Sequence, residues 1–573
     1  MKNFLKMLLA SVLGVFIVFM IVFFMLLLSV NFSEPVIVKN NSILKISLDK
    51  PLVDRAGMPS INLSSLSIES NMGLNHILFG IERAKYDPRI KGIYLELSSI
   101  DAGIASVEEI RNALTSFKQS GKYVLAYAEY YSQKAYYLAT IADKIYLNPF
   151  GSVDFRGISS EITFFKGLLD KLGIDVQIIR HGKFKSAIEP LILNSASEES
   201  KAQIMEYMGS IWNFILQTIS EARDINPEDL NKTADNIELT FAEDAMNKNF
   251  VDKLLYEDEV LAELRKYSGG TALNTVDISK YYVRPVSTDT KSDKIALVYA
   301  SGEIISGEGE TDIMSKNMVS VIRAARNDST VKAVVFRVNS PGGSAAASEI
   351  IARELELTKQ TKPVVISMGD LAASGGYWIS APSHKIFAHH TTITGSIGVF
   401  MMLPDFGKAA KDKLGITFDV VKTNEHADFP SVTRPLKPAE KDYLQKSVEY
   451  VYSKFIDKVA TFRNISAEKA DSIGQGRVWS GVNALDIGLI DYFGGIAEAV
   501  EEAARLADIS DYTLLELPRE LSTFEMILKS IETKVSGSAN SELSATLKHY
   551  EYLMSSLKNY GMMAKLPYEI TIE

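Results

Sequence analysis

The chain has 573 residues, of which 46% are hydrophobic, and its formal net charge is −10 at pH 7. This length suits two to four domains, and the acidic balance argues against nucleic-acid binding, which needs a basic surface. Cysteine is absent, which excludes disulfides, thiolate metal sites and a cysteine nucleophile. We expect no metal and no cofactor.

The first predicted element is an apolar segment near the N-terminus. Residues 8–30 are almost without interruption apolar, and about 20 such residues are enough to cross the core of a bilayer. A cleavable signal peptide, the alternative, usually has an apolar core of only about 7 to 15 residues. We therefore predict a retained transmembrane anchor within residues 1–31.

The charges beside this segment predict its orientation. Lys2 and Lys6 precede it, and no Lys or Arg follows it before Lys39. Because positive charges mark the cytoplasmic side, the N-terminus is predicted to be cytoplasmic. The rest of the chain would then lie outside the cytoplasm, which in a bacterium means a single-pass protein of the inner membrane with periplasmic or extracytoplasmic domains.

Strands alternate with helices along the remainder of the chain. In the first half, strand-like segments at 92–97 and 123–127 alternate with helix-like segments at 107–119 and 135–142. This alternation is typical of α/β domains with a mostly parallel sheet. The predicted division is an anchor (1–31), a tether (32–44), a first domain (45–268), a linker (269–293), a second domain (294–510) and a C-terminal helical extension (511–573).

The two predicted domains are copies of each other. Residues 331–398 repeat residues 90–153 in an altered form, and long amphipathic stretches follow at 199–223 and 438–462. Such self-similarity predicts two domains of one fold. At one constant offset, Lys91 falls on Lys332, Tyr136 on Tyr377 and Lys144 on Lys385.

The differences between the copies carry the functional information. Gln133 stands opposite Ser374, and Lys185 stands opposite Ala427, so each copy keeps a reactive side chain that the other lacks. The glycine pair of the second copy, 342–343, is also absent from the first. One serine and one lysine are the components of a single Ser–Lys site, which two domains would here share.

The glycine pair Gly342 and Gly343 follows the apolar strand 334–338. Backbone N–H groups at the end of a parallel strand, where a helix begins, can point at a developing oxyanion. A tight turn also favours glycine for steric reasons alone, so this motif by itself leaves both interpretations open.

Ser374 follows the strand-like segment 363–368 and precedes Gly375 and Gly376. We predict that it begins a helix as the nucleophile, with the N–H of Gly375 as an oxyanion donor. The alternative is a helix N-cap, the commonest role of a serine at this place.

A lysine acts as a base only when its pKa falls from about 10.4 towards about 7 to 8. Lys185 lies among apolar neighbours in sequence, Phe184, Ala187 and Ile188, and loss of hydration would lower its pKa. A histidine base in a Ser-His-Asp site is the competing interpretation. Three histidines lie near the serine in sequence: His384, His389 and His390.

These motifs together resemble the signal peptide peptidase A family of serine peptidases, in its long double-domain form. The resemblance covers the chain from the anchor to about residue 510. It rests on residues 339–344 (NSPGGS), 370–377 (DLAASGGY), 394–398 (TGSIG) and 184–190 (FKSAIEP). It implies two tandem Clp/crotonase-like domains with a ββα superhelix behind an N-terminal transmembrane helix.

The resemblance also implies roles for individual residues. Ser374 would be the nucleophile, Lys185 the general base and Ser396 the residue that orients the lysine. The oxyanion donors would be the N–H of Gly375 and that of Gly342, or of Gly343. The implied activity is serine endopeptidase cleavage of remnant signal peptides and similar hydrophobic peptides, by a membrane-anchored homotetramer.

Two other classes of protein remain as alternatives at this point. A catalytically inactive membrane scaffold could clamp peptides with the same fold, although it would have no use for Ser374 and Lys185. A crotonase-type acyl-CoA enzyme could use the same glycine turns, although it would not need an anchor that places it outside the cytoplasm.

Overall fold

The computed structural model describes residues 38–56, 60–62, 67–69, 71–269, 272–281, 293–309, 312–519 and 562–565, with scattered positions before residue 21. The predicted anchor segment, 8–30, therefore lies largely outside the described residues. Within the described part of the chain, no helix has both the length and the apolar character that a membrane span needs.

The first repeat is built on a six-stranded parallel sheet in the order β10-β8-β7-β6-β1-β11. Its central strands are buried along most of their length, which explains why they read as apolar runs. The strands are β1 (Ser42–Ser47), β6 (Ile90–Glu96), β7 (Tyr123–Ala128), β8 (Lys144–Leu147), β10 (Lys253–Leu254) and β11 (Asn274–Asp277). The last of these lies within the segment predicted as a linker.

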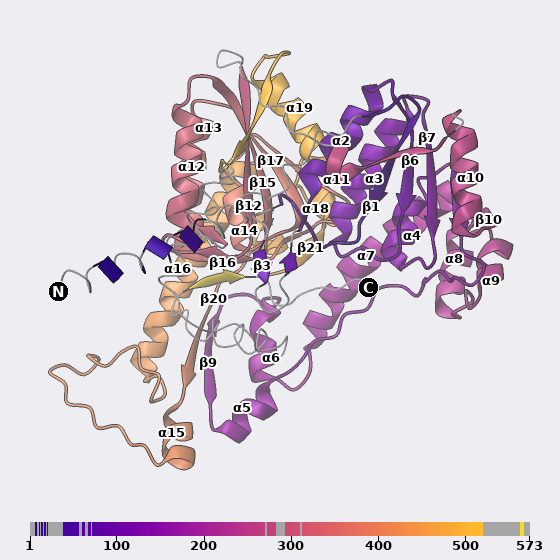
Figure 1. Cartoon of the computed structure of the whole chain (residues 1–573). Coiled ribbons are helices and arrows are strands. Elements are labelled where there is room, and N and C mark those ends of the chain that lie inside the picture. Colours follow the sequence, from indigo (N-terminus) through magenta and orange to yellow (C-terminus); the bar gives the residue numbers. More distant parts are fainter. Residues whose placement is uncertain are drawn as a thin grey trace.

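The second repeat has a sheet that matches the first strand for strand, in the order β22-β18-β17-β15-β12-β23. Two further strands, β19 (Ile393–Gly395) and β21 (Val478–Ser480), continue from the far end of β17. The matching strands are β12 (Lys294–Ser301), β15 (Val331–Ser340), β17 (Val364–Ala373), β18 (Lys385–Ala388), β22 (Tyr492–Phe493) and β23 (Thr513–Leu517). Figure 1 shows the two repeats side by side.

The repeat extends to individual hydrogen bonds. The buried hydroxyl of Tyr136 donates to the carbonyl of Phe250 (2.9 Å), and that of Tyr377 donates to the carbonyl of Leu489 (2.8 Å). A buried tyrosine needs such a partner for its polar end. The prediction of two α/β domains of one fold is therefore confirmed.

Helices cover the two sheets (Figure 1). The segments predicted as helical near 107–119 and 135–142 are helical, with ends moved by a few residues. In the first repeat the helices are α2 (Leu74–Tyr86), α3 (Ile104–Lys118), α4 (Gln133–Ala139), α5 (Lys166–Leu172), α6 (Glu189–Ile192), α7 (Glu198–Arg223), α8 (Pro227–Asp235), α9 (Ala242–Asn247), α10 (Glu257–Ser268) and α11 (Ile278–Tyr281). In the second they are α12 (Ser315–Asn327), α13 (Ala345–Lys359), α14 (Gly375–Ser380), α15 (Gly407–Leu414), α16 (Pro438–Arg463), α17 (Ala467–Ile473), α18 (Gly481–Asp486) and α19 (Ile496–Leu506).

The long helices α7 and α16 pack their apolar faces on the cores of their own repeats. Tyr207 and Ile211 of α7 belong to the core of the first repeat, and Val448 and Phe455 of α16 belong to that of the second. Both amphipathic stretches are therefore helices that cover a core.

A third sheet joins the two repeats, in the order β14-β13-β16-β24-β20-β9. The two repeats meet in this sheet where β9, from the first repeat, pairs antiparallel with β20, from the second. This pairing carries the chain that follows β9 into the second repeat. The strands are β9 (Asp175–Arg180), β13 (Ile304–Ile305), β14 (Ile313–Met314), β16 (Gly342–Ser344), β20 (Phe400–Asp405) and β24 (Met563–Lys565). The short strands β2 (Leu52–Val53), β3 (Ser60–Asn62), β4 (Ser67–Glu69) and β5 (Met72–Gly73) form two separate pairs.

Candidate active site

Ser374 lies between the end of β17 and the first residue of α14. Its backbone has φ 56° and ψ −113°, and it stands at the N-cap position of α14 without a side-chain capping hydrogen bond, so its hydroxyl does not serve as a cap. A serine with positive φ is strained, and such strain persists only where the surrounding structure enforces it. The N–H of Ser374 donates to the carbonyl of Gly395 (2.8 Å), which helps to fix this conformation.

Lys185 reaches this serine from the other repeat. Its Nζ lies 2.7 Å from Ser374 Oγ, 3.0 Å from Ser396 Oγ and 3.1 Å from the carbonyl oxygen of Ser396. All three residues are fully buried. The structure therefore brings together the serine and the lysine that the two copies keep separately.

Burial lowers the pKa of Lys185 well below its ordinary value, because the ammonium loses its hydration. A neutral amine has two N–H donors and one lone pair. The carbonyl of Ser396 can only accept a hydrogen bond, and Ser396 Oγ can accept the other. The lone pair is then left to accept the hydroxyl proton of Ser374, which is the arrangement that a general base requires.

The segment that carries Lys185 is held by backbone hydrogen bonds to the second repeat. The N–H of His181 donates to Val399 (3.2 Å), and the N–H of Phe184 donates to Gln475 (3.1 Å). Gly476, with φ 84°, packs directly on the lysine, where a Cβ would come within 2.7 Å of the Lys185 Cβ. Only a residue without a side chain fits this contact.

Ser396 also has a positive φ, 50°. Its N–H donates to the carbonyl of Arg477 (2.6 Å), and its hydroxyl lies 3.5 Å from the carbonyl of Gly476. The Ser396 hydroxyl is thus held against the lysine by a rigid backbone. This is the position expected of a residue that orients Lys185.

The three predicted oxyanion glycines lie in α14 and β16, two elements that contact each other. Gly375 directly follows the serine as the first residue of α14, where backbone N–H groups lack partners within the helix. The N–H of Gly342 donates to Ser340 Oγ (3.1 Å). Gly343 has φ 154°, and a Cβ there would meet the Ile304 carbonyl at 2.1 Å.

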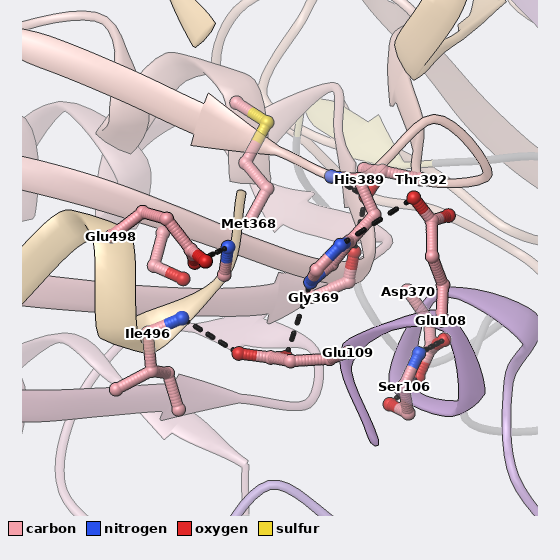
Figure 2. Close-up of polar contacts among 12 residues, drawn as sticks. Ser106, Glu108, Glu109, Met368, Gly369, Asp370, His389, Thr392, Ile496 and Glu498 are labelled. Carbon is pink, nitrogen blue, oxygen red and sulfur yellow. Dashed lines mark hydrogen bonds and ion pairs between the residues drawn. The ribbon is translucent and has the colours of Figure 1, made fainter. Parts of the chain in front are cut away.

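The histidines of the competing interpretation lie in other environments. His389 is buried between Glu108 and Glu109 at ion-pair distances of 3.7 and 3.4 Å, as Figure 2 shows. Burial alone would lower the pKa of His389, but the two carboxylates outweigh it and raise the pKa to about 10. His390 Nδ1 lies 2.6 Å from the same Glu108, and His384 Nδ1 accepts the N–H of Val364.

The cluster around His389 joins the two repeats. Arg337, fully buried, pairs with Asp54 (2.7 Å) and Glu109 (2.8 Å) of the first repeat. Asp370, two residues beyond the strand segment predicted before Ser374, accepts the N–H and the hydroxyl of Ser106, as Figure 2 shows. These ion pairs and hydrogen bonds cross between the repeats, so the cluster fixes how the repeats sit against each other.

Sequence reasoning missed one residue that supports the site. Gln203 of α7 donates to the carbonyl of Phe184 (3.1 Å) and to Ser186 Oγ (3.0 Å), and it accepts the N–H of Val478 (3.3 Å). It therefore brackets the lysine and ties it to the second repeat. No motif marks this glutamine, because its role depends on how α7 packs.

Fold and site together define a two-repeat α/β protein with a buried serine–lysine contact between the repeats. The model of peptidase family S49 matches the chain twice, at residues 116–270 and 356–510. The chain belongs to this family, and the match to both repeats confirms the predicted family and the duplication.

Curated relatives agree with this assignment. "Protease 4" of Haemophilus influenzae is 39% identical to this chain, and the aligned region covers 75% of this chain and 72% of the relative's length. "Protease 4" of Salmonella typhi is 37% identical, and the aligned region covers 87% of this chain and 83% of the relative's length. "Serine protease SPPA, chloroplastic" of Arabidopsis thaliana is 33% identical, and the aligned region covers 82% of this chain and 71% of the relative's length. The chain is therefore a serine protease of family S49.

Proposed function

We propose that the chain is a membrane-anchored endopeptidase in which Ser374 and Lys185 form a catalytic dyad. The observation that carries this proposal is the 2.7 Å contact between Lys185 Nζ and Ser374 Oγ inside a site without solvent exposure. A lysine kept from water in this way is a base near neutral pH rather than a permanent cation.

The proposed reaction begins when Ser374 Oγ attacks the carbonyl carbon of the scissile peptide bond and Lys185 accepts the hydroxyl proton. The new ammonium is stabilised by Ser396, through its hydroxyl and its carbonyl oxygen. The N–H of Gly375, with that of Gly342 or Gly343, stabilises the oxyanion. The ammonium then protonates the leaving amine, and an acyl-enzyme remains.

Water completes the cycle. Lys185, again neutral, removes a proton from a water molecule, and the resulting hydroxide attacks the ester carbonyl. Collapse of the second tetrahedral intermediate breaks the ester bond, and the proton held by Lys185 returns to Ser374 Oγ. The product is a carboxylic acid, and both residues recover their starting protonation states.

The proposed substrates are cleaved signal peptides and similar hydrophobic peptides. Ile188, three residues after Lys185 in the chain, packs with Phe400 and Met402 in one apolar cluster that would suit such side chains. The apolar segment 8–30 would anchor the chain in the bacterial inner membrane, with its domains outside the cytoplasm and close to such peptides. The assembly is proposed to be a homotetramer.

A serine-directed fluorophosphonate tests the proposed nucleophile. We expect the probe to add once to the full chain by intact mass, and peptide mapping to place it on Ser374. The matched control is Ser380→Ala in α14, because Ser380 is equally buried and hydrogen-bonds only within its helix. Labelling of Ser374→Ala at the wild-type rate would contradict the proposal, because it would place the reactive serine elsewhere, and a wild-type chain that does not react at all would favour an inactive peptide-binding scaffold.

The membrane anchor is tested separately. Expressed with its N-terminus intact, the full chain should stay with the membrane fraction after alkaline carbonate extraction. A variant that starts at residue 38 should be released. Release of the full chain would contradict the anchor and leave the dyad untouched.

A further inference from the structure

Lys185 lies on a short arm that follows β9, residues 181–185. β9 ends at Arg180, so its pairing with β20 stops before the lysine is reached. The arm belongs to the first repeat, whereas the serine that it must meet belongs to the second. Contacts between the arm and the second repeat therefore decide whether Lys185 Nζ stays at 2.7 Å from Ser374 Oγ.

Tyr452 of α16 contacts the first residue of this arm. Its ring stacks on the ring of His181, with 3.7 Å between the centroids and 21° between the planes. His181 Nδ1 also lies 2.5 Å from Glu449 Oε2, one turn earlier on α16. Tyr452 is buried in the core of the second repeat, so the histidine rests on a surface that is fixed by packing.

The hydroxyl of Tyr452 acts on the arm at a second place, through Gln475. It donates to Asp471 Oδ1 (2.6 Å) and accepts the N–H of Gln475 (3.1 Å). Gln475 has φ 54°, a conformation that persists only where its surroundings enforce it.

In this conformation Gln475 supports the arm from below. Its carbonyl accepts the N–H of Phe184, the residue before the lysine (3.1 Å). The same carbonyl oxygen approaches Gly182 so closely that a Cβ there would come within 2.4 Å of it. One tyrosine thus holds both ends of the arm, the first through its ring and the second through its hydroxyl.

We propose that Tyr452 is a positioning residue that keeps Lys185 docked on Ser374, through the stack on His181 and through the backbone of Gln475. The inference rests on the proposed function, because it takes Lys185 as the general base. Tyr452 acts through the arm rather than on the peptide, so it belongs to the supply of the base and not to the binding of substrate.

This role predicts a particular kinetic signature. An arm that is docked for only part of the time lowers kcat and kcat/KM together and leaves KM unchanged. Burial lowers the pKa of Lys185, so water that enters beside a loosened arm should raise that pKa towards its ordinary value. The acidic limb of the pH–rate profile should then move to higher pH. A variant that only contains less folded protein would lose the same fraction of its rate at every pH.

The first test is Tyr452→Phe, which keeps the ring and removes the hydroxyl. We expect kcat for a hydrophobic fluorogenic peptide to fall by about two- to tenfold, as the loss of a buried hydrogen bond implies, with KM unchanged and the acidic limb at higher pH. The matched control is Tyr136→Phe, which also removes a buried hydroxyl that donates to a carbonyl, in the first repeat. Equal kcat and equal pH profiles in the two variants, with circular dichroism unchanged, would overturn the role of the hydroxyl.

The second test separates the stack from the ion pair. His181→Phe keeps a flat ring on Tyr452 without the contact to Glu449, and it should retain nearly wild-type kcat. His181→Ala should lower kcat by about two- to tenfold, the range expected for an aromatic pair, and should move the acidic limb as Tyr452→Phe does. Wild-type kcat in His181→Ala would contradict the stack.

A double-mutant cycle then tests whether the two residues act by one route. His181→Ala should cost less in Tyr452→Leu than in the wild-type chain, because the ring that it stacks on is already gone. Losses of kcat that simply multiply would show that the residues act independently, and this would overturn the proposed positioning role.

The two proposals fail in different ways. If the chain is not a Ser–Lys peptidase, the wild-type chain will neither cleave the peptide nor react with the fluorophosphonate. If only the positioning role is wrong, the wild-type chain and the Tyr452 and His181 variants will all cleave it, with the same kcat and the same acidic limb.

Discussion

Replacing Ser396 by alanine removes one of the two oxygens that hold Lys185. The hydroxyl lies 3.0 Å from Lys185 Nζ, and the carbonyl of the same residue, at 3.1 Å, remains. When Lys185 takes the serine proton it becomes an ammonium, and its hydrogen bond to the hydroxyl becomes charge-assisted. The hydroxyl therefore stabilises the transition state more than the ground state.

The expected fall in kcat follows from the loss of that one hydrogen bond. A hydrogen bond to a charged group contributes about 1.5 to 3 kcal/mol, which corresponds to a fall of about ten- to hundredfold in kcat. KM should change little, because Ser396 is buried behind the lysine. Loss of the acceptor also destabilises the ammonium, so the pKa of Lys185 falls and the acidic limb of the pH–rate profile moves to lower pH.

The assay is hydrolysis of a fluorogenic hydrophobic peptide between about pH 5 and 10, a range that spans the pKa expected of a lysine base, with folding checked by circular dichroism. Alanine keeps the Cβ, so the cost of the positive φ is the same in both proteins. Ser348→Ala is the matched control, because Ser348 is equally buried and donates to the backbone carbonyl of Ser344, the residue that precedes α13. A Ser396→Ala protein with kcat within twofold of wild type and an unmoved acidic limb would refute the reasoning.

Four further predictions follow from contacts in the site and in the cluster around His389. Lys185→Arg should abolish hydrolysis at every pH that the fold tolerates, because a guanidinium does not lose its proton, and measurable turnover would contradict a base at this position. Gly476→Ala should lower kcat at least tenfold. The control Gly415→Ala has a similar positive φ but open space around it, so it should keep its kcat and lose only about 1 to 2 kcal/mol of stability. Measurements of kcat and of thermal unfolding on both variants check this difference. Arg337→Leu leaves buried carboxylates unpaired and should destabilise the protein by about 3 to 5 kcal/mol, seen as a lower Tm. Burial would raise the pKa of Glu109, but Arg337 and His389 lower it to about 2. The contribution of this carboxylate to the stability of the fold should therefore be full above about pH 4.5 and be lost as the pH falls towards 2. A Tm that does not change in that pH window would contradict this prediction.

The sequence predicts the fold well where the two copies repeat each other. Tyr136 and Tyr377 align by sequence alone, and both donate to equivalent carbonyls in the structure. The complementary losses, Gln133 against Ser374 and Ala427 against Lys185, predict a shared site. In the first repeat Gln133 binds the N–H groups of Arg156 and Gly157, so it fills the position that the serine occupies in the second.

Other features depend on contacts between distant parts of the chain and leave no local pattern. The strand β11 lies in a segment whose Gly, Ser and Thr content favoured a linker, because pairing with β1 overrides local preference. β24 has only three residues, and its partners β16 and β20 lie far from it in sequence. Gln203 acts on the lysine segment only because α7 packs beside it.

The most direct test of the shared dyad compares peptide hydrolysis by the full chain with that by Ser374→Ala, Lys185→Ala and Ser348→Ala. We predict loss of hydrolysis in the first two variants, with unchanged circular dichroism, and wild-type activity in the third. Full activity in Lys185→Ala would contradict the account, because it would show that a group other than this lysine accepts the serine proton.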